Sequence, residues 1–335
     1  MIEIKNLTKR FGKSTALDSV SFTVGDGSIF GLVGSNGAGK STLLRILSGV
    51  LKADGGEALV FGENVFENSG VKEKIAFVSD FPYFNPGATL NSMAFYFKNT
   101  FSDWNEGEYG RLKSLFKLNS EQKISAMSKG MQRQAAIILA LSHKPHLVLF
   151  DEIFDGLDPV VRELVKKILI EYVSCTGATV IISTHNLREL EGFCDHIGML
   201  HRGGLLLEKD IDCSSMGVFR IQFAMEDESY VALKPKLNIV KERRVGKMAE
   251  LTIKGSEDEI LDLIKQFNPL FCEMLPLTLE ELFISEMEEA GYDINNLFAK
   301  KSLPENRAGK KLGNQALVSA VCRFISGFFV FHIFE

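Results

Sequence analysis

The sequence has few cysteines, no excess of basic residues and no recognisable secretory signal. Its 335 residues include five cysteines, an odd number, and none belongs to a Cys-x-x-Cys pair. We therefore expect neither a disulfide scaffold nor a zinc site, and a reducing compartment is favoured. The net charge of -5 disfavours direct binding to DNA or RNA, since nucleic-acid-binding domains are usually basic. Residues 1–5 lack the basic segment and apolar core of a secretory signal.

Composition and patterning predict a globular protein that begins with an α/β domain. Hydrophobic residues make up 45% of the chain and charged residues 24%, which excludes intrinsic disorder and leaves room for two or three domains. Strand-like and helical runs alternate over the first two hundred residues, so helices are expected on both faces of a sheet. Strands are predicted at 21–24, 29–33, 75–79, 147–150 and 179–183, with helices after Lys40, Gly130 and Pro159.

The rest of the chain divides into further segments. A helical insertion subdomain is expected at about 81–145, and the hairpin-like run 199–207, with its turn at Gly203-Gly204, closes the first domain near residue 212. Residues 213–290 predict a small α+β accessory domain without a visible catalytic cluster. Its strands are expected at 219–225 and 250–254, and its helices at 257–267 and 279–287.

The last segment, 291–335, is a basic linker followed by an apolar tail at 316–334. As a helix of 19 residues, this tail would just span a hydrocarbon core of about 30 Å. Arg323 near its middle opposes insertion by roughly 2.5–3.5 kcal/mol. Three interpretations stay open: a membrane anchor, an amphipathic or protein-packed helix, and a remnant of a permease sequence. The second of these is favoured.

A phosphate-binding loop is complete in the run Gly34-Ser35-Asn36-Gly37-Ala38-Gly39-Lys40-Ser41-Thr42. The run lies between a predicted strand and a predicted helix, which is the context that the motif requires. Its glycines let backbone N–H groups turn towards the β- and γ-phosphates, Lys40 adds an ammonium, and the Ser41 hydroxyl is placed to hold Mg²⁺. The chain is therefore expected to bind a nucleoside triphosphate.

Two adjacent carboxylates, Asp151 and Glu152, follow the apolar run 147–150. Successive side chains of a strand point in different directions, so the two have different surroundings. We expect Asp151 to hold Mg²⁺ through water and Glu152 to act as the general base towards the attacking water. A surface turn or a helix cap is the alternative interpretation, and the phosphate loop upstream makes it the less favoured one.

A second helix start is marked by Ser128, Lys129 and Gly130. The Ser128 hydroxyl and the Gly130 amide would lie at a helix N-terminus, where backbone N–H groups lack partners within the helix and favour an anion. In isolation, this tripeptide would favour a simple N-cap at Ser128.

Together these motifs resemble the ATP-binding cassette (ABC) family over about residues 1–212. Ser128-Lys129-Gly130 resembles the family signature, which closes over the γ-phosphate bound by a partner subunit. The resemblance thus implies a head-to-tail dimer with two ATP between its subunits. Phe11 matches the aromatic residue that stacks on adenine. The run 155–159 resembles the D-loop, and His185, after Ser183-Thr184, matches the switch histidine that touches the γ-phosphate.

The chain departs from the family pattern at three positions. Asp80 stands where the family usually has glutamine, and an ionised carboxylate accepts hydrogen bonds but does not donate them. Asp80 is therefore expected to approach Mg²⁺ or the attacking water. Lys129 replaces a signature glycine, and Ile153 replaces a proline. Asp80 with Lys129 resembles the branch of importer-like and antibiotic-resistance ATPases that includes YtrB-type subunits. The run 276–283 resembles the closing helix of multidrug and antibiotic exporter ATPases.

The fold implied by the resemblance is a P-loop NTPase of ABC type with a helical insertion subdomain, followed here by a small α+β unit. The implied activity is ATP hydrolysis coupled to transport, with ATP and Mg²⁺ as cofactors. Expected partners are permease subunits and a second ATPase subunit, identical or not, with the chain peripheral to the cytoplasmic face of the membrane. Most rings of the aromatic-rich run 81–116 are expected to form the core of the helical insertion. Any that stay exposed are candidates for the permease contact that the resemblance implies. A soluble regulatory ABC ATPase and an ATP-binding sensor with little turnover are the alternatives.

Overall fold

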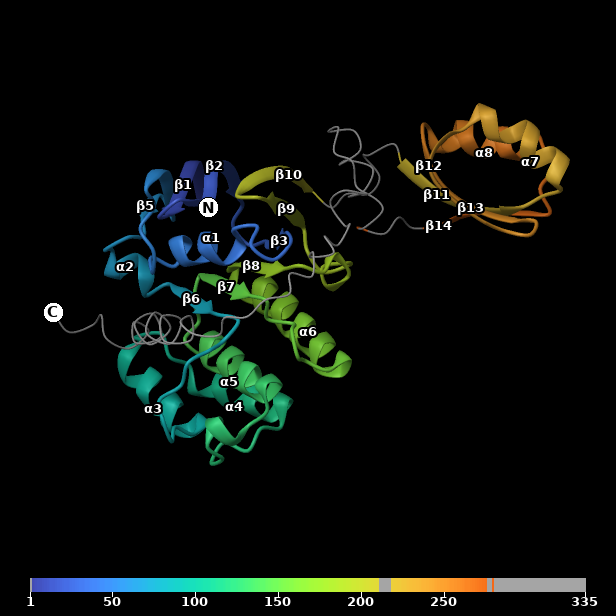
Figure 1. Ribbon diagram of the computed structural model, residues 1–335. Helices are drawn as coiled ribbons and strands as arrows, with labels where there is room; N and C mark the ends of the chain where they lie inside the picture. Colours follow the sequence, from blue (N-terminus) through green and yellow to red (C-terminus); the bar gives the residue numbers. More distant parts are fainter. Residues whose placement is uncertain (1, 211–217, 276–278, 280–335) are drawn as a thin grey trace, which may run out of the picture. The chain divides into compact units, whose positions relative to one another are not determined.

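The computed structural model describes residues 2–210, 218–275 and 279, which form two compact units (Figure 1). The described residues 2–210 belong to the first unit, and residues 218–275 and 279 belong to the second. The predicted domain boundary near residue 212 lies outside the described residues. So do the predicted helix beyond residue 279 and the tail 291–335. Within the described part of the chain, the longest helices are too short or too polar to cross a membrane.

The first unit begins with an antiparallel sheet of which the sequence analysis predicted only residues 21–24. Its strands are β1 (Ile2–Phe11), β2 (Ser14–Val24), β4 (Gly55–Val60) and β5 (Glu63–Asn64), in the order β2-β1-β4-β5. Between Ile4 and Leu7 the pairing of β1 with β2 shifts register, and such bulges break the alternation of buried and exposed residues. The expectation of a single sheet was therefore wrong.

A second sheet, of six strands, forms the centre of the unit. Its order is β10-β9-β3-β8-β7-β6. The strands are β3 (Ile29–Val33), β6 (Ile75–Val78), β7 (Leu147–Asp151), β8 (Thr179–Thr184), β9 (His196–His201) and β10 (Gly204–Asp210). All neighbouring pairs are parallel except β9 with β10. Every residue of β3, β7 and β8 is buried, as expected for parallel strands covered on both faces.

Two helices and one hairpin turn beside this sheet can be compared with their predicted positions. The helices α1 (Lys40–Leu47) and α6 (Pro159–Thr176) begin where predicted, because Gly39 and Asp158 precede them as N-caps. The hairpin turn lies at Arg202-Gly203, one residue earlier than predicted. Both residues have positive φ, 48° and 85°, which is the geometry of a type I′ hairpin turn.

The segment predicted as a helical subdomain contains mostly helices in the structure. It contains α3 (Leu90–Thr100), α4 (Glu106–Phe116) and α5 (Lys129–Ser142), together with the short helix η1 (Ile124–Ala126). Tyr109, Leu112 and Phe116 are buried on one side of α4, and Figure 1 shows the three main helices grouped below the six-stranded sheet. Short helical segments elsewhere in the first unit are α2 (Ser69–Lys72) and η2 (Leu187–Glu189).

The second unit has the order β-α-β-β-α-β. Its elements are β11 (Val218–Ala224), α7 (Asp227–Leu233), η4 (Lys234–Lys236), β12 (Asn238–Val245), β13 (Met248–Lys254), α8 (Glu257–Lys265) and β14 (Phe271–Leu275). The strand order is β12-β13-β11-β14 with every neighbouring pair antiparallel, which is the ferredoxin-like arrangement. Ile221, Phe223, Leu251 and Ile253 form its core. The sequence analysis missed β12, α7 and β14.

Candidate functional site

The phosphate loop joins the end of β3 to the start of α1. Gly39 is the N-cap of α1, and no side chain caps the helix. The first backbone N–H groups of a helix have no partner within it, so the amides of Lys40, Ser41 and Thr42 are free to bind an anion. No acidic residue lies in the first turn of α1, which leaves its positive dipole end uncompensated.

Two glycines of the loop are required by close packing. A Cβ atom on Gly34 would lie 2.4 Å from the carbonyl oxygen of Leu200, and one on Gly39 would lie 2.5 Å from that of Ala16. Gly39 also has a φ of 110°, which disfavours any residue with a side chain. The loop is thus held tightly against β2 and β9.

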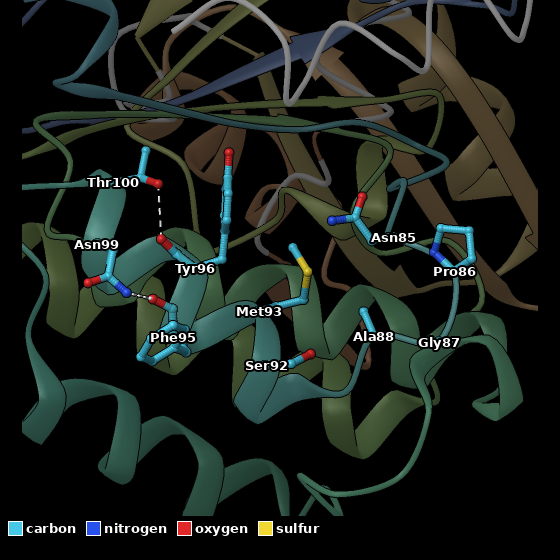
Figure 2. Close-up of a pocket in the computed structure, with 10 residues that line it drawn as sticks. All are labelled: Asn85, Pro86, Gly87, Ala88, Ser92, Met93, Phe95, Tyr96, Asn99 and Thr100. Carbon is cyan, nitrogen blue, oxygen red and sulfur yellow. Dashed lines mark hydrogen bonds between the residues drawn. The ribbon is translucent and has the colours of Figure 1, made fainter. Parts of the chain in front are cut away.

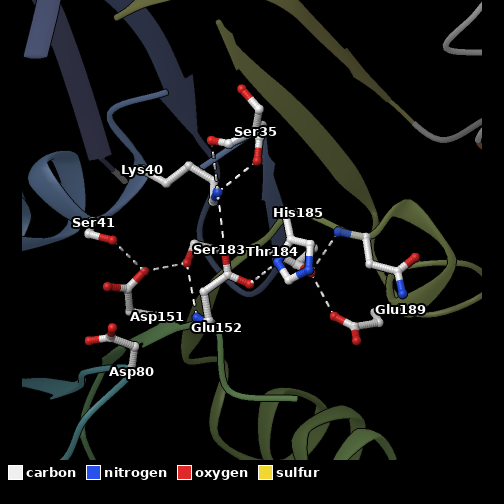
Figure 3. A network of polar contacts seen from close by, with 12 residues as sticks. Ser35, Lys40, Ser41, Asp80, Asp151, Glu152, Ser183, Thr184, His185 and Glu189 are labelled. Atoms are coloured by element: carbon white, nitrogen blue, oxygen red, sulfur yellow. Dashed lines mark hydrogen bonds and ion pairs between the residues drawn. The ribbon is translucent and has the colours of Figure 1, made fainter. Parts of the chain in front are cut away.

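The Lys40 ammonium is buried at the centre of the site. Its side chain is 5% exposed, and Nζ donates to the carbonyl oxygen of Gly34 at 2.7 Å. Nζ also lies 3.1 Å from Oε1 of Glu152 (Figure 3). The predicted phosphate-binding lysine and the predicted general base therefore meet directly.

Asp151 is fully buried, and only one of its two carboxylate oxygens accepts hydrogen bonds. Its Oδ1 accepts hydrogen bonds from the hydroxyls of Ser41, at 3.0 Å, and Ser183, at 2.6 Å. Its Oδ2 is buried without a hydrogen-bond partner, and such an unpaired oxygen is costly. Carboxylate and hydroxyl oxygens are ligands that Mg²⁺ prefers. The donor set therefore fits the predicted magnesium site on the Oδ2 side of Asp151.

Asp80 lies on the same side of the site, after β6, as Figure 3 shows. Burial raises the pKa of its carboxyl, and the negative charge of Asp151 raises it further. A cation between the two carboxylates would relieve this repulsion. The backbone carbonyl of Asp80 accepts a hydrogen bond from the buried Arg133 at 3.0 Å. The structure thus brings Asp80 to the predicted metal site and adds Arg133, which the sequence analysis missed.

Contacts of its backbone and of its side chain both position Glu152. Its backbone N–H donates to the carbonyl oxygen of Ser183 at 3.1 Å, and its φ of 49° is unusual for a residue with a side chain. Its Oε2 lies 2.9 Å from Nδ1 of His185. Strain of this kind is found at functional sites, and here it turns the carboxylate towards Lys40 and His185.

A buried pair behind His185 holds the loop that follows β8. The Thr184 hydroxyl donates to Glu189 at 2.6 Å, and Glu189 in turn lies 3.4 Å from the guanidinium of Arg162. Thr184 and Glu189 are both buried. Neither Glu189 nor Arg162 was predicted, because their roles depend on how η2 and α6 pack beside the end of β8.

A second group of possible metal ligands consists of Glu152, Asp155 and His185. One donor atom from each lies within 4.8 Å of the others. Both Glu152 oxygens are already paired, one with Lys40 and the other with His185. Asp151, whose Oδ2 has no hydrogen-bond partner, therefore fits the predicted cation better than this group does.

The signature tripeptide lies apart from these groups. Ser128 is the N-cap of α5 and accepts a hydrogen bond from the Met131 amide at 3.2 Å. A Cβ atom on Gly130 would lie 2.8 Å from the carbonyl oxygen of Gly156, so the start of α5 packs on the D-loop-like run. Among the described residues, no hydrogen bond or ion pair joins residues 128–130 to the phosphate loop.

Phe11 ends β1 and is 50% exposed. The Lys9 ammonium lies 5.5 Å from the centre of its ring. An exposed ring on the antiparallel sheet suits a stacking role, and adenine binding by Phe11 stays a prediction.

Comparisons with known proteins agree with this geometry. Residues 17–155 match the family model described as ABC transporter. The bacitracin transport ATP-binding protein BcrA of Bacillus licheniformis is 31% identical over 63% of this chain and 70% of its own length. The chain belongs to the ABC transporter ATP-binding family. It is accordingly an ATPase subunit of the ABC type, with a P-loop NTPase fold.

Two further similarities extend this result. The ABC transporter ATP-binding protein YtrB of Bacillus subtilis is 28% identical over 85% of this chain and 98% of its own length. Among solved structures, an ATP-binding subunit of an ABC transporter is 27% identical, with a TM-score of 0.58 over 63% of this chain and 90% of that chain. The similarity to YtrB includes the second unit, whereas the solved structure matches about the length of the first.

Proposed function

We propose that two of these ABC subunits bind two ATP molecules between them, and that each site combines the phosphate loop of one subunit with the signature of the other. One observation carries the proposal. Lys40, Asp151 and Glu152 converge at the carboxyl ends of β3 and β7, whereas Ser128 is exposed at the start of α5 without a contact to that loop. Each chain therefore presents two unlike halves of a site on separate surfaces.

In this proposal the residues of the first half divide the chemistry. The free amides at the start of α1 and the Lys40 ammonium bind the β- and γ-phosphates. Glu152 accepts the proton of the attacking water, and His185, 2.9 Å from Glu152, contacts the γ-phosphate. Ser41 and Asp151, with Asp80, would hold Mg²⁺, which neutralises charge on the phosphates when it is bound.

A groove on the helical subdomain supports the proposed permease contact. It has a volume of about 590 Å³ and is lined along α3 and the loop before it by Phe95, Tyr96, Met93 and Pro86, among others (Figure 2). Phe95 is 71% exposed. Exposed aromatic patches rimmed by polar residues mark interaction sites. We infer that a cytoplasmic segment of a permease docks here, which would place the chain peripherally on the cytoplasmic face of the membrane.

The relatives favour the transporter over the regulatory alternative. BcrA is a bacitracin transport ATP-binding protein and YtrB an ABC transporter ATP-binding protein, and we propose that this chain serves a permease of the same antibiotic-export branch. The soluble regulatory ATPase and the sensor with little turnover are not favoured by any of these relatives.

Co-purification tests the permease contact. When the affinity-tagged chain is expressed in its native cells and purified from their membranes, a polytopic membrane protein should co-purify with it. Phe95→Asp should abolish this co-purification while ATP binding persists. Leu115→Asp is the matched control, because Leu115 is also exposed on the helical subdomain but does not line the groove. Recovery of only ribosomes or DNA with the wild-type chain would contradict the transporter function.

A further inference from the structure

The sheet of the second unit has two unlike faces. Tyr230 of α7 and Ile260 of α8 pack into one core with strand residues such as Phe223, so both helices cover the same face (Figure 1). Successive residues of a strand point to opposite faces of a sheet. The strand residues that alternate with this core therefore lie on the face turned away from α7 and α8, which we call the outer face.

An exposed apolar row crosses the outer face. Four residues form it by direct pairing between neighbouring strands: Val245 of β12, Met248 of β13, Ala224 of β11 and Phe271 of β14. Directly paired residues of antiparallel strands lie side by side on one face. Val245 is 71% exposed, Met248 41% and Phe271 39%, and the neighbouring Leu270 is also exposed. Contiguous exposed apolar side chains of this kind mark interaction sites.

A polar row lies beside the apolar row, two residues away along each strand. It consists of Arg243, Glu250, Gln222 and Glu273, paired in the same strand order. Glu250 is neutralised by Arg220, whose Nε lies 3.0 Å from its carboxylate. Arg243 and Glu273 are exposed, and neither forms an ion pair with another described residue. They stand on opposite edge strands, three strand spacings or about 14 Å apart, so they cannot pair within one chain.

We propose that the outer face packs against the outer face of a second copy of this chain, about a two-fold axis parallel to the strands. This rotation places β12 of one copy over β14 of the other, and β13 over β11. Val245 then meets Phe271 of the second copy, and Arg243 meets Glu273 of the second copy. Stacked sheets lie about 10 Å apart, a gap that an arginine and a glutamate side chain bridge together.

The charges around the row favour a second copy over a membrane surface. Anionic lipids attract clusters of unpaired cations. The basic residues beside the hairpin turn are already paired, Lys247 with Glu226 and Arg244 with Asp227. The polar row itself ends in one cation and one anion, which is a self-complementary pattern. A single row is also smaller than the interface of a permanent dimer, so we expect a weak and reversible contact.

Exchange of charges tests this pairing in the nucleotide-free chain of 335 residues. Sedimentation of the wild-type chain over a range of concentrations should show a reversible monomer–dimer equilibrium. Arg243→Glu and Glu273→Arg should each raise the dissociation constant by about tenfold or more, because like charges then meet at both pairs. An equimolar mixture of the two variants should dimerise as the wild type does, since each pair between the copies again joins a cation with an anion.

A matched pair of substitutions tests the apolar row. Val245→Asp places a charge in the contact with Phe271 of the second copy, and it should raise the dissociation constant by about tenfold or more. Val231→Asp is the control, because Val231 is 69% exposed but lies on α7, which covers the other face. The control should leave dimerisation unchanged. At concentrations where the chain is monomeric, both variants should keep the wild-type melting temperature.

Three results would overturn the inference. They are a wild-type chain that stays monomeric at every concentration, a dimer that Val245→Asp does not weaken, and a mixture of Arg243→Glu with Glu273→Arg that dimerises no better than either variant alone. Binding of a monomeric wild-type chain to phosphatidylserine vesicles, lost in Val245→Asp, would assign the row to a membrane instead. Because nucleotide is absent throughout, failure of this contact and failure of the proposed ATP site are measured separately.

Discussion

The two halves of the proposed ATP site are built in opposite ways. The phosphate-loop half is buried and connected by hydrogen bonds, with Asp151, Ser183 and Lys40 all under 10% exposed. The signature half is exposed and is held by one N-cap and the packing of Gly130 on Gly156. This difference suggests that the first half fixes the geometry of the reaction, whereas the second half only has to meet a partner. Substitutions in the two halves should therefore impair ATP hydrolysis in different ways.

The largest effect is expected at Glu152. Replacing Glu152 with glutamine removes the proton acceptor but keeps the shape of the side chain, so the hydrolysis rate should fall by about 10²–10⁴-fold. ATP binding, measured by equilibrium dialysis, should persist. Glu163→Gln, which changes an exposed carboxylate on α6, is the control. An unchanged hydrolysis rate in Glu152→Gln would refute the assignment of the base.

The next largest effect is expected at Ser128, in the signature half of the site. Ser128→Asp keeps a good N-cap but places a negative charge against the γ-phosphate of the partner. Hydrolysis should fall by at least about tenfold, because like charges at short range repel strongly, while ATP binding to the isolated chain is unchanged. Ser128→Asn caps the helix equally well without the charge and should retain most of the activity. If Ser128→Asp hydrolyses ATP at the wild-type rate, Ser128 does not face a phosphate.

The smallest effect concerns the helix that carries the signature. His143 follows α5, is buried against the Phe101 ring with 4.2 Å between ring centres, and burial lowers its pKa to about 4. The unfolded chain therefore binds a proton more readily, and stability is lost as the pH falls from about 6.5 towards 4, by up to about 3 kcal/mol. Denaturant titrations should show a smaller loss for His143→Leu over this range. An identical pH dependence in both proteins would contradict the buried neutral histidine.

The same comparison explains what the sequence could predict. The phosphate loop, the acidic pair and the signature are local motifs, so their residues could be named without knowing how the chain folds. Ser183, Glu189 and Arg133 act through elements distant in sequence, and their roles depend on which strand ends are neighbours. Asp151 pairs in register with Ser183, so the order of the parallel strands was the missing information.

Most of the antiparallel sheet was missed for a different reason. β1 and β2 shift register several times, and Asn6 and Ser19 adopt positive φ. These bulges remove the alternating pattern from which strands are predicted. The small second unit was predicted as α+β, but its ferredoxin-like order depends on strand pairing that no local pattern reports.

Complementation between two inactive variants tests the composite site most directly. Glu152→Gln keeps an intact signature, and Ser128→Asp keeps an intact phosphate loop and base. In a head-to-tail dimer of the two, one site combines only intact halves. An equimolar mixture should therefore recover about a quarter of the wild-type hydrolysis rate if subunits pair at random. A mixture no more active than the average of the two variants alone would contradict a site shared between two copies of the chain.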